Sequence, residues 1–357
     1  MENYSVIIPS YTVGPEAYLQ IPHYCLPYGS RAVVIGGHRA MAASRQKLEN
    51  AVAGSGLSIT AFLHYGEEAS YEAAALLEAD PFLQEADMIF AVGGGKAIDT
   101  AKLAALHLNK PFFTFPTIAS NCAAASSVAI IYHPDGSFRE FVHYLEGSRH
   151  VFIDTDIIAR SPWEYFWAGI GDTYAKYYEV TISARGETLE HYLALGVNMS
   201  RMCMEPLVLF GEKALADHRA GIASYELEQC ILAIVITTGW VSMLVSRRHN
   251  MLYNGGVAHA MFYSLCSLPG FEKDHIHGVV VGFGVLLQLL IDNDEAEFEK
   301  LRAFNRRIGL PTTFSEIGVT MEDLEKVVHL IISDEDVEHF PYQLTKEMIM
   351  NAARKIA

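Results

Sequence analysis

Basic residues are scarce in this sequence of 357 residues, in which 26 Lys and Arg face 42 Asp and Glu and the formal net charge is −16. A surface that binds nucleic acid or an anionic membrane needs a basic footprint. We therefore expect neither kind of partner, and we interpret the excess of acidic residues as a source of solubility.

Cysteines are also few. They form no CxxC pair and no regular framework, and the five are Cys25, Cys122, Cys203, Cys230 and Cys266. This excludes a disulfide-stapled scaffold and a CxxC metal or redox motif. Residues 1–4 contain no basic segment and lead into no long apolar core, so we expect no secretory signal peptide. Together these absences predict a cytoplasmic protein with reduced thiols.

Apolar runs long enough to cross a membrane are missing as well. The two that come closest, residues 230–245 and 279–291, are shorter than the roughly 20 residues that a spanning helix needs. The first is also interrupted by Thr237, Thr238 and Gly239. We predict that both are buried helices and that the chain has no membrane-spanning segment.

The segments that are present alternate between strand-like and helix-like patterns over about the first 155 residues. Such alternation predicts a parallel sheet with helices on both faces, and residues 128–143 predict a β-hairpin around Pro134-Asp135-Gly136. From about residue 160 the pattern is almost wholly helical, with helix starts at Ser161-Pro162 and Thr320. We expect an α/β domain with a Rossmann-like parallel sheet at 1–160 and an all-α domain at 161–357.

One phrase, Ala-Val-Gly-Gly-Gly-Lys-Ala-Ile-Asp-Thr-Ala-Lys at 91–102, follows an apolar run of strand length and leads into a helical pattern. Glycines before a helix N-terminus let an anion approach the unpaired backbone N–H groups. The spacing is neither that of a Walker A loop nor that of G-x-G-x-x-G. A plain left-handed turn would use the same glycines. The turns at 36–37, 93–95 and 117–120 would all lie beyond the carboxyl ends of strands, which favours a nucleotide site.

Asp172 lies in an apolar helical neighbourhood, where a carboxylate needs a partner. His259 and His277 are eighteen residues apart, and on one straight helix they would be about 27 Å apart. Because Pro269-Gly270 interrupts that helix, a fold-back can bring the two imidazoles together. With fifteen histidines a chance pair at this spacing is unsurprising, and Asp172 alone could be a salt-bridged or helix-start residue.

These motifs occur in the order seen in the iron-containing alcohol dehydrogenase superfamily. The matching motifs are Gly-Gly-Gly-Lys-x-x-Asp-x-x-Lys at 93–102, Pro-Thr-Ile-Ala-Ser at 116–120, Gly-Ile-Gly-Asp at 169–172, Ala-His-Ala at 258–260 and His-Gly at 277–278. The chain most resembles the glycerol dehydrogenase branch, over nearly its whole length. The resemblance implies a dehydroquinate synthase-like fold, in which a nucleotide-binding domain faces a helical domain that holds a divalent metal, and it suggests a homo-oligomer.

The resemblance implies that Asp172, His259 and His277 are the metal ligands and act in catalysis through the metal. One carboxylate and two imidazoles suit Zn²⁺, or Fe²⁺, and leave positions open for water and substrate. It also implies NAD or NADP, bound by Gly93, Gly94, Gly95, Lys96 and Asp99 around the pyrophosphate and by Thr117, Ser120, Ser126, Val128 and Tyr132 around the nicotinamide. His275 is a possible proton relay, although residues i and i+2 of a helix face different ways, which favours a surface or supporting role.

Three departures from the family pattern concern substrate and cofactor. Cys122 stands where glycerol dehydrogenases usually have Asp, which resembles bacterial hydroxycarboxylate dehydrogenases acting on small 2-oxo acids, although it could be a buried thiol without a role. Gly37, His38 and Arg39 replace an acidic residue that often holds the NAD ribose, so NADP is as credible as NAD, unless Arg39 only starts a helix. Residues 277–281 read His-Gly-Val-Val-Val instead of His-Gly-Glu-Lys-Val.

We therefore expect a metal-dependent NAD(P)(H) oxidoreductase that interconverts a small polar alcohol or 2-hydroxy acid and its carbonyl by hydride transfer. The alternatives are a glycerol dehydrogenase proper, a dehydroquinate synthase-like lyase on the same fold, and a non-catalytic binding protein. Residues 121–128 and 257–267 supply no basic side chain for a phosphorylated substrate apart from His259, which argues against the lyase.

Overall fold

The computed structural model describes residues 5–144, 146–246 and 253–357. The chain divides into two compact units, residues 1–163 with 217–240 and residues 164–216 with 241–357. Segment 217–240 thus belongs to the first unit and not, as expected, to the helical remainder. The expectation about a signal peptide concerns residues 1–4, which lie outside the described residues.

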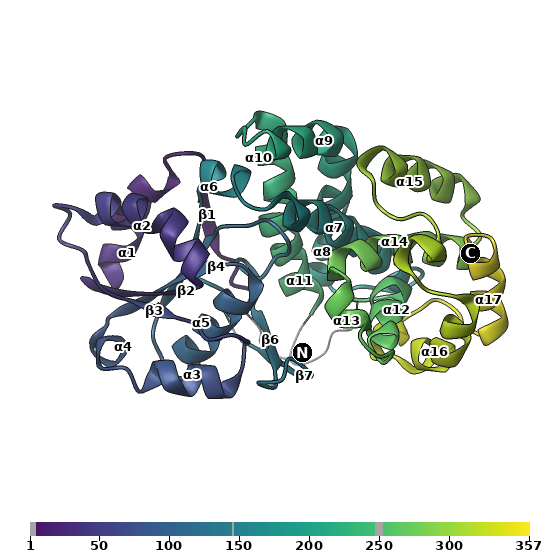
Figure 1. The fold of residues 1–357 in the computed structure, drawn as a ribbon, viewed down its shortest axis with the longest axis horizontal. Coiled ribbons are helices and arrows are strands. Elements are labelled where there is room, and N and C mark those ends of the chain that lie inside the picture. Colours follow the sequence, from purple (N-terminus) through teal and green to yellow (C-terminus); the bar gives the residue numbers. More distant parts are fainter. Residues whose placement is uncertain (1–4, 145, 247–252) are drawn as a thin grey trace. The chain divides into compact units, whose positions relative to one another are not determined.

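A parallel sheet forms the centre of the first unit (Figure 1). In the described part of the chain it has six strands in the order β1-β8-β5-β4-β2-β3, all paired in parallel. The strands are β1 (Ser10–Val13), β2 (Arg31–Gly36), β3 (Ser58–His64), β4 (Met88–Gly93), β5 (Phe112–Pro116) and β8 (His150–Ile153). Strands β4 and β5 are buried along their whole length, which explains their continuous apolar sequences. The predicted Rossmann-like sheet is confirmed.

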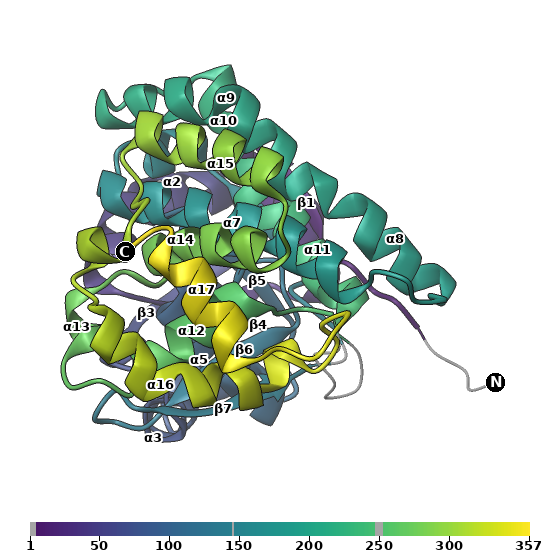
Figure 2. The same ribbon diagram turned by 90° about the vertical axis from the view of Figure 1, so that its right-hand side faces the viewer.

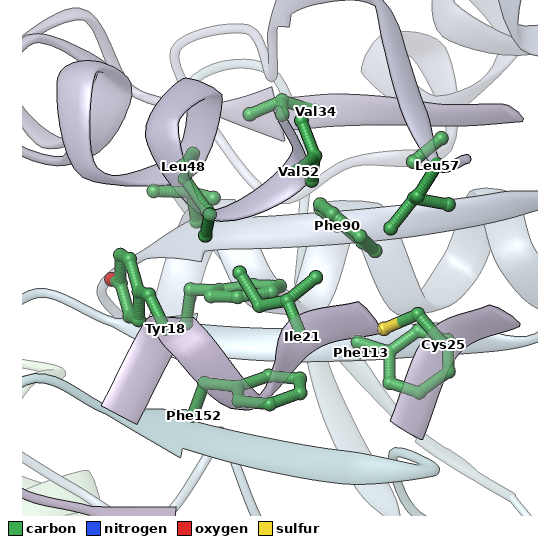
Figure 3. Close-up of a cluster of buried hydrophobic side chains, with 14 of the residues drawn as sticks. Tyr18, Ile21, Cys25, Val34, Leu48, Val52, Leu57, Phe90, Phe113 and Phe152 are labelled. Atoms are coloured by element: carbon green, nitrogen blue, oxygen red, sulfur yellow. The ribbon is translucent and has the colours of Figure 1, made fainter. Parts of the chain in front are cut away.

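Helices cover both faces of this sheet. On one face α1 (Ile21–Cys25) and α2 (His38–Val52) pack against the strands, and on the other lie α3 (Tyr71–Glu78) and α5 (Gly95–His107). Figure 3 shows the core beneath α1 and α2, where side chains from helices and strands interlock; they include Tyr18, Ile21, Cys25, Val34, Leu48, Val52, Leu57, Phe90, Phe113 and Phe152. Such packing gives the strand ends a rigid support.

The predicted hairpin consists of β6 (Val128–Tyr132) and β7 (Phe138–His143), which pair antiparallel. Its turn has the expected chemistry, because the Asp135 carboxylate accepts hydrogen bonds from the Ser137 backbone N–H at 2.9 Å and the Ser137 hydroxyl at 2.6 Å. Gly136 adopts φ +88°, a conformation that favours glycine. The hairpin prediction is confirmed.

The rest of the described chain is helical. Its longer helices are α7 (Trp163–Ser183), α8 (His191–Met199), α9 (Arg201–Arg219), α10 (Tyr225–Ile231), the π-helix η3 (Leu232–Thr237), α11 (Thr238–Val245), α12 (Val257–Leu265), α14 (His277–Ile291), α15 (Glu295–Ile308), α16 (Met321–Ser333) and α17 (Lys346–Arg354). Short elements are η1 (Ala17–Gln20), η2 (Leu26–Tyr28), α4 (Pro81–Glu85), α6 (Thr155–Ala159), α13 (Phe271–Asp274), η4 (Phe314–Ile317) and η5 (Glu335–Val337). In Figure 2, α14 lies among α12, α15 and α17, with which it packs. Thr320 caps α16 and forms a capping box with Asp323, as its sequence predicted.

Two helical segments, His191–Arg219 and Tyr225–Val245, are long and apolar enough to cross a membrane by length and composition alone. In the second, 67% of the most apolar window is buried inside the protein, as in a core helix. Residues 279–291, the other run considered from sequence, lie in α14 and are all buried. The expectation of buried helices therefore holds for both runs, and apolar length alone is weak evidence that His191–Arg219 or Tyr225–Val245 crosses a membrane.

His150 joins the edge strand β1 to the sheet. Its ring is buried, its Nδ1 lies 2.7 Å from the Ser10 hydroxyl, its Nε2 lies 2.8 Å from the Thr12 hydroxyl, and Tyr24 stacks on it at 3.7 Å. Burial, together with the neighbouring His23, lowers the pKa of His150 to about 4. Below pH 6.5 the unfolded chain therefore binds a proton that the folded protein excludes until about pH 4.

Consequently the stability that His150 contributes is present above pH 6.5 and is lost as the pH falls through this window towards 4. At about 1.4 kcal/mol per unit of pKa the loss is at most roughly 3 kcal/mol. Urea unfolding of the wild type and of His150→Phe, which cannot titrate, should show a shallower pH dependence for the variant over this window. Equal slopes would contradict the assignment.

Candidate metal centre and cofactor-binding residues

The predicted cofactor residues of the first unit begin at one edge of the sheet. Gly36 is in register with Val92, and Gly93 with Pro116, so the carboxyl ends of β2, β4 and β5 are neighbours. The N–H of Thr117 donates to the carbonyl of Gly93 at 3.1 Å, which fixes the loop after β5 against the glycine turn. The turns at 36–37, 93–95 and 117–120 therefore lie at the same edge, as predicted.

Each glycine of the triplet occupies a position where a side chain would be strained or would clash. Gly93 has φ +145°, a Cβ on Gly94 would lie 2.6 Å from Ile118 Cδ1, and a Cβ on Gly95 would lie 2.9 Å from Asn121 Nδ2. Gly94 is the N-cap of α5 and has no side chain to cap the helix. The first backbone N–H groups of α5 thus follow a turn without side chains, the arrangement that binds a phosphate.

Asp99 belongs to a buried network. Its carboxylate accepts from the Lys102 ammonium at 3.1 Å and from the Ile130 backbone N–H at 3.1 Å, while Lys102 also donates to the Ser126 hydroxyl at 3.3 Å and the Val128 carbonyl at 2.7 Å. Burial raises the pKa of Asp99, and the charge of Lys102 opposes this. The network ties α5 to β6, so the structure brings Asp99, Ser126 and Val128 together.

Other predicted cofactor residues are spread around this network. Lys96 pairs with Glu68 at 2.6 Å, and its ammonium lies 5.6 Å from the centre of the Tyr132 ring. Thr117 is buried and Ser120 is half-buried. The carbonyl of Cys122 accepts from the N–H groups of Ala125 and Ser126 at 2.9 and 3.0 Å. Cys122 therefore begins a tight turn and is half-buried.

Gly37 and His38 lie where β2 meets α2. Gly37 is the N-cap of α2, and His38 and Arg39 are exposed in its first turn. The His38 ring stacks on His64, at the end of β3, with ring centres 4.0 Å apart. Sequence reasoning did not include His64, because its proximity depends on the pairing of β2 with β3.

In the second unit, Asp172, His259 and His277 converge, as predicted from the resemblance. Their ligand atoms all lie within 4.8 Å of one another. Asp172 Oδ1 is 3.3 Å from His277 Nε2 and 3.6 Å from His259 Nε2. Donors bound to one tetrahedral ion at about 2.0–2.1 Å would be separated by roughly 3.3 Å, so the spacing fits. The side chains of Asp172 and His259 are 13% exposed and that of His277 is 40% exposed, so the triad opens beside His277.

The predicted fold-back places the two histidines on antiparallel helices. The chain turns at Gly270, which has φ +80°, and Phe262 near the end of α12 packs edge-on against His277 at the start of α14, with ring centres 4.4 Å apart. Close helix packing adds Asp172. A Cβ on Gly171 would overlap the carbonyl oxygen of Gly278, and a Cβ on Gly278 would overlap that of Ala168. Each of these two ligands is therefore next to a glycine that lets α7 and α14 approach.

The electrostatics of the triad favour a cation. Burial alone would raise the pKa of Asp172, but hydrogen bonds from both imidazoles hold it well below its usual range. Burial would lower the pKa of His259, yet the charge of Glu179 and the hydrogen bonds to Asp172 and Glu179 raise it to about 10. Two carboxylates thus flank one imidazole, and together with the nitrogen and oxygen donors they suit a divalent metal.

His275 and the valines that follow His277 lie close to the triad but supply none of its ligand atoms. Both ring nitrogens of His275 face carbonyl oxygens, those of Phe271 at 2.9 Å and Ile317 at 3.0 Å, which fits a supporting role better than a proton relay. Val279 and Val280, which replace the charged pair of the family pattern, are buried in α14.

Two further residues hold the predicted ones in place. Lys102 ends the motif at 93–102 but had no role predicted for it, and Glu179 was not predicted at all. Their signals were regular helical offsets, because Lys102 is three residues after Asp99 and Glu179 is seven, or about two turns, after Asp172.

Comparison with known proteins identifies the family of this chain. The model of the family "Iron-containing alcohol dehydrogenase" matches residues 9–155. Hydroxycarboxylate dehydrogenase A of Escherichia coli (strain K12) is 31% identical over 332 residues, covering 92% of this chain and 89% of the relative. Glycerol dehydrogenase 1 of Schizosaccharomyces pombe is 27% identical over 358 residues, covering 97% and 77%.

The fold is shared with solved structures. The crystal structure of glycerol dehydrogenase from Schizosaccharomyces pombe superposes with a TM-score of 0.87 at 25% identity, covering 100% of this chain and 91% of that one. A parallel sheet followed by helices, the order of the motifs and a relative above 30% identity all agree. The chain is an oxidoreductase that belongs to the iron-containing alcohol dehydrogenase family.

Proposed function

We propose that the protein is a metal-dependent NAD(P)(H) oxidoreductase that interconverts a small polar alcohol or 2-hydroxy acid and its carbonyl. The observation that carries this proposal is the convergence of the Asp172, His259 and His277 ligand atoms within 4.8 Å. The donor set suits Zn²⁺, with Fe²⁺ as the alternative. When bound, these groups would supply polarisation of the substrate oxygen by the metal and hydride transfer by the nicotinamide.

The chain's own residues have separate tasks in this proposal. Asp172 supplies the negative charge of the triad. Glu179 holds the His259 ring at Nδ1, the nitrogen on the side away from Asp172. The more exposed His277 borders the side open to substrate. The turn at residues 93–95 binds the pyrophosphate through backbone N–H groups, and Thr117, Ser120, Ser126, Val128 and Tyr132 line the nicotinamide. Lys102 and Asp99 hold the strand that carries Val128.

For the adenosine end we propose that NADP is accepted as well as NAD. His38 and Arg39 place basic groups after β2 where an acidic residue would exclude a 2′-phosphate. Arg can bind a phosphate through two parallel hydrogen bonds, which supports this assignment.

For the substrate we propose a 2-oxo or 2-hydroxy acid, with residue 122 as the determinant. Cys122→Asp should lower kcat/KM for 2-oxo acids and favour uncharged hydroxyketones. Two like charges about 6 Å apart repel by about 1–3 kcal/mol at an effective dielectric constant near 20, which corresponds to about 5–150-fold. The measurement is steady-state kinetics on a 2-oxo acid and on dihydroxyacetone. Cys122→Ser, which adds no charge, is the control, and an unchanged preference in Cys122→Asp would contradict the role.

Glycerol dehydrogenase activity is the second candidate, since several curated relatives carry that name. The test of both is an absorbance screen that follows oxidation of NADH and of NADPH with 2-oxo acids, dihydroxyacetone and aldehydes. Consumption with a 2-oxo acid supports the first candidate, consumption with dihydroxyacetone alone supports the second, and no consumption contradicts both. We also propose that the protein is cytoplasmic, that it forms a homo-oligomer, and that it binds neither nucleic acid nor a membrane.

A further inference from the structure

Helix α12, which carries His259, begins in an unusual way. Its N-cap is Gly256, which has no side chain to cap the helix. The first N–H groups are satisfied by other helices, because Val257 N–H donates to Gln288 Oε1 at 3.0 Å and His259 N–H donates to Glu179 Oε1 at 2.9 Å. A Cβ on Gly256 would lie 2.7 Å from Gln288 Oε1 and 2.8 Å from Glu179 Cγ, so this approach needs a glycine.

The two capping residues come from the helices that carry the other two ligands. Glu179 lies on α7 with Asp172, and Gln288 lies on α14 with His277. Each helix therefore contributes one ligand and one cap, and the start of α12 is joined to both. This arrangement fixes the start of α12 against both helices, while only Glu179 contacts His259 itself.

Glu179 makes one contact more than Gln288. Its side chain is fully buried, and its second oxygen, Oε2, lies 2.6 Å from His259 Nδ1. A carboxylate can only accept, so Nδ1 must carry a proton. Nε2, which faces Asp172, is then the nitrogen available to a cation, which would displace the Nε2 proton that otherwise bonds Asp172. A carboxylate in this position commonly fixes the ring and raises the basicity of a metal-binding histidine.

We infer that Glu179 is a positioning residue that presents Nε2 of His259 to the metal, and that Gln288 only caps the helix. The inference rests on the proposed metal site. Glu179→Gln can keep accepting from the His259 N–H, but its amide NH₂ then meets Nδ1 and favours the wrong tautomer. Gln288→Met removes a neighbouring cap without touching the imidazole and is the matched control.

The test is Zn²⁺ affinity, measured by competition with a chromophoric chelator. Glu179→Gln should bind Zn²⁺ about 10–100-fold more weakly than the wild type. Gln288→Met should lose thermal stability, as expected for a missing cap, and keep its affinity within about threefold. An unchanged affinity in Glu179→Gln, or an equal loss in both variants, would overturn the positioning role.

A second measurement needs no variant. In the Zn²⁺-loaded wild type, ¹H–¹⁵N NMR of the imidazole should show the proton on Nδ1 and the metal on Nε2 of His259. The opposite assignment would overturn the inference even if Glu179→Gln did not fold. A wild type that binds no Zn²⁺ and no Fe²⁺ would instead overturn the ligand triad itself, so the two failures are distinguishable.

Discussion

Replacing His277 with alanine is expected to abolish turnover while leaving the fold nearly intact. In the proposed site the imidazole supplies one of three metal ligands, and loss of the metal would remove several kcal/mol of charge stabilisation. At 1.36 kcal/mol per factor of ten, kcat/KM should fall by about 10³-fold or more. The side chain is 40% exposed and begins α14, so its removal leaves no buried cavity and should change the melting temperature little.

The control for this experiment is His275→Ala. His275 is two residues away, but its nitrogens face the carbonyls of Phe271 and Ile317, outside the triad. It should lose some stability and keep turnover. Measured bound metal should fall in His277→Ala and remain in His275→Ala. Retained turnover in His277→Ala would contradict the mechanism, and loss of turnover in His275→Ala alone would restore that residue as a proton relay.

The second large effect is expected at Gly171, where α7 touches α14. In Gly171→Ala the new Cβ would overlap the carbonyl oxygen of Gly278, and backbone on both sides leaves no flexible group to move aside. The helices must separate, at a cost of about 1–3 kcal/mol or more in the free energy of unfolding. Because Asp172 and His277 are the adjacent residues, a displacement near 1 Å should also lower kcat/KM by about 100-fold.

Gly211→Ala is the matched control, since it also adds a methyl group to a helix of the second unit. Its Cβ would lie 3.3 Å from the end of the Phe304 ring, a contact that small shifts can relieve. The measurements are denaturant unfolding, bound metal and steady-state kinetics of both variants, and Gly171→Ala should show the larger loss in each. Equal behaviour of the two would show that close contact between α7 and α14 is not what aligns the ligands.

Much of the fold could be predicted from local patterns. Strands β2 and β4 are apolar runs that end in glycine, and the hairpin turn at Asp135 and Gly136 has residues that favour its conformation. The return of residues 217–240 to the first unit could not be predicted. A buried helix has the same apolar period whichever core it joins, and here Gly239 packs against Ala125, a contact invisible in sequence.

The sequence predicted the three ligands of the candidate site but not the residues that support them. The ligands Asp172, His259 and His277 came from motif order, because their spacing in sequence carries little information. The convergence of their ligand atoms agrees with the prediction, and their metal-binding role stays a proposal. Glu179 was missed, and Lys102 had no role beyond its place in the motif, because a buried charge is recognised by its partners. His259 is 80 residues from Glu179, and Val128 is 26 residues from Lys102.

The distribution of the ligands along the chain has a consequence for how the enzyme matures in the cell. Asp172 and Glu179 are synthesised well before His259 and His277, so the ribosome releases two carboxylates into the nascent core before their imidazole partners exist. Contacts between such distant segments form late, after the intervening chain has been closed into a loop. For the proposed metal site, uptake of the ion is therefore expected in the last stage of maturation, and bound metal would report which molecules have completed folding.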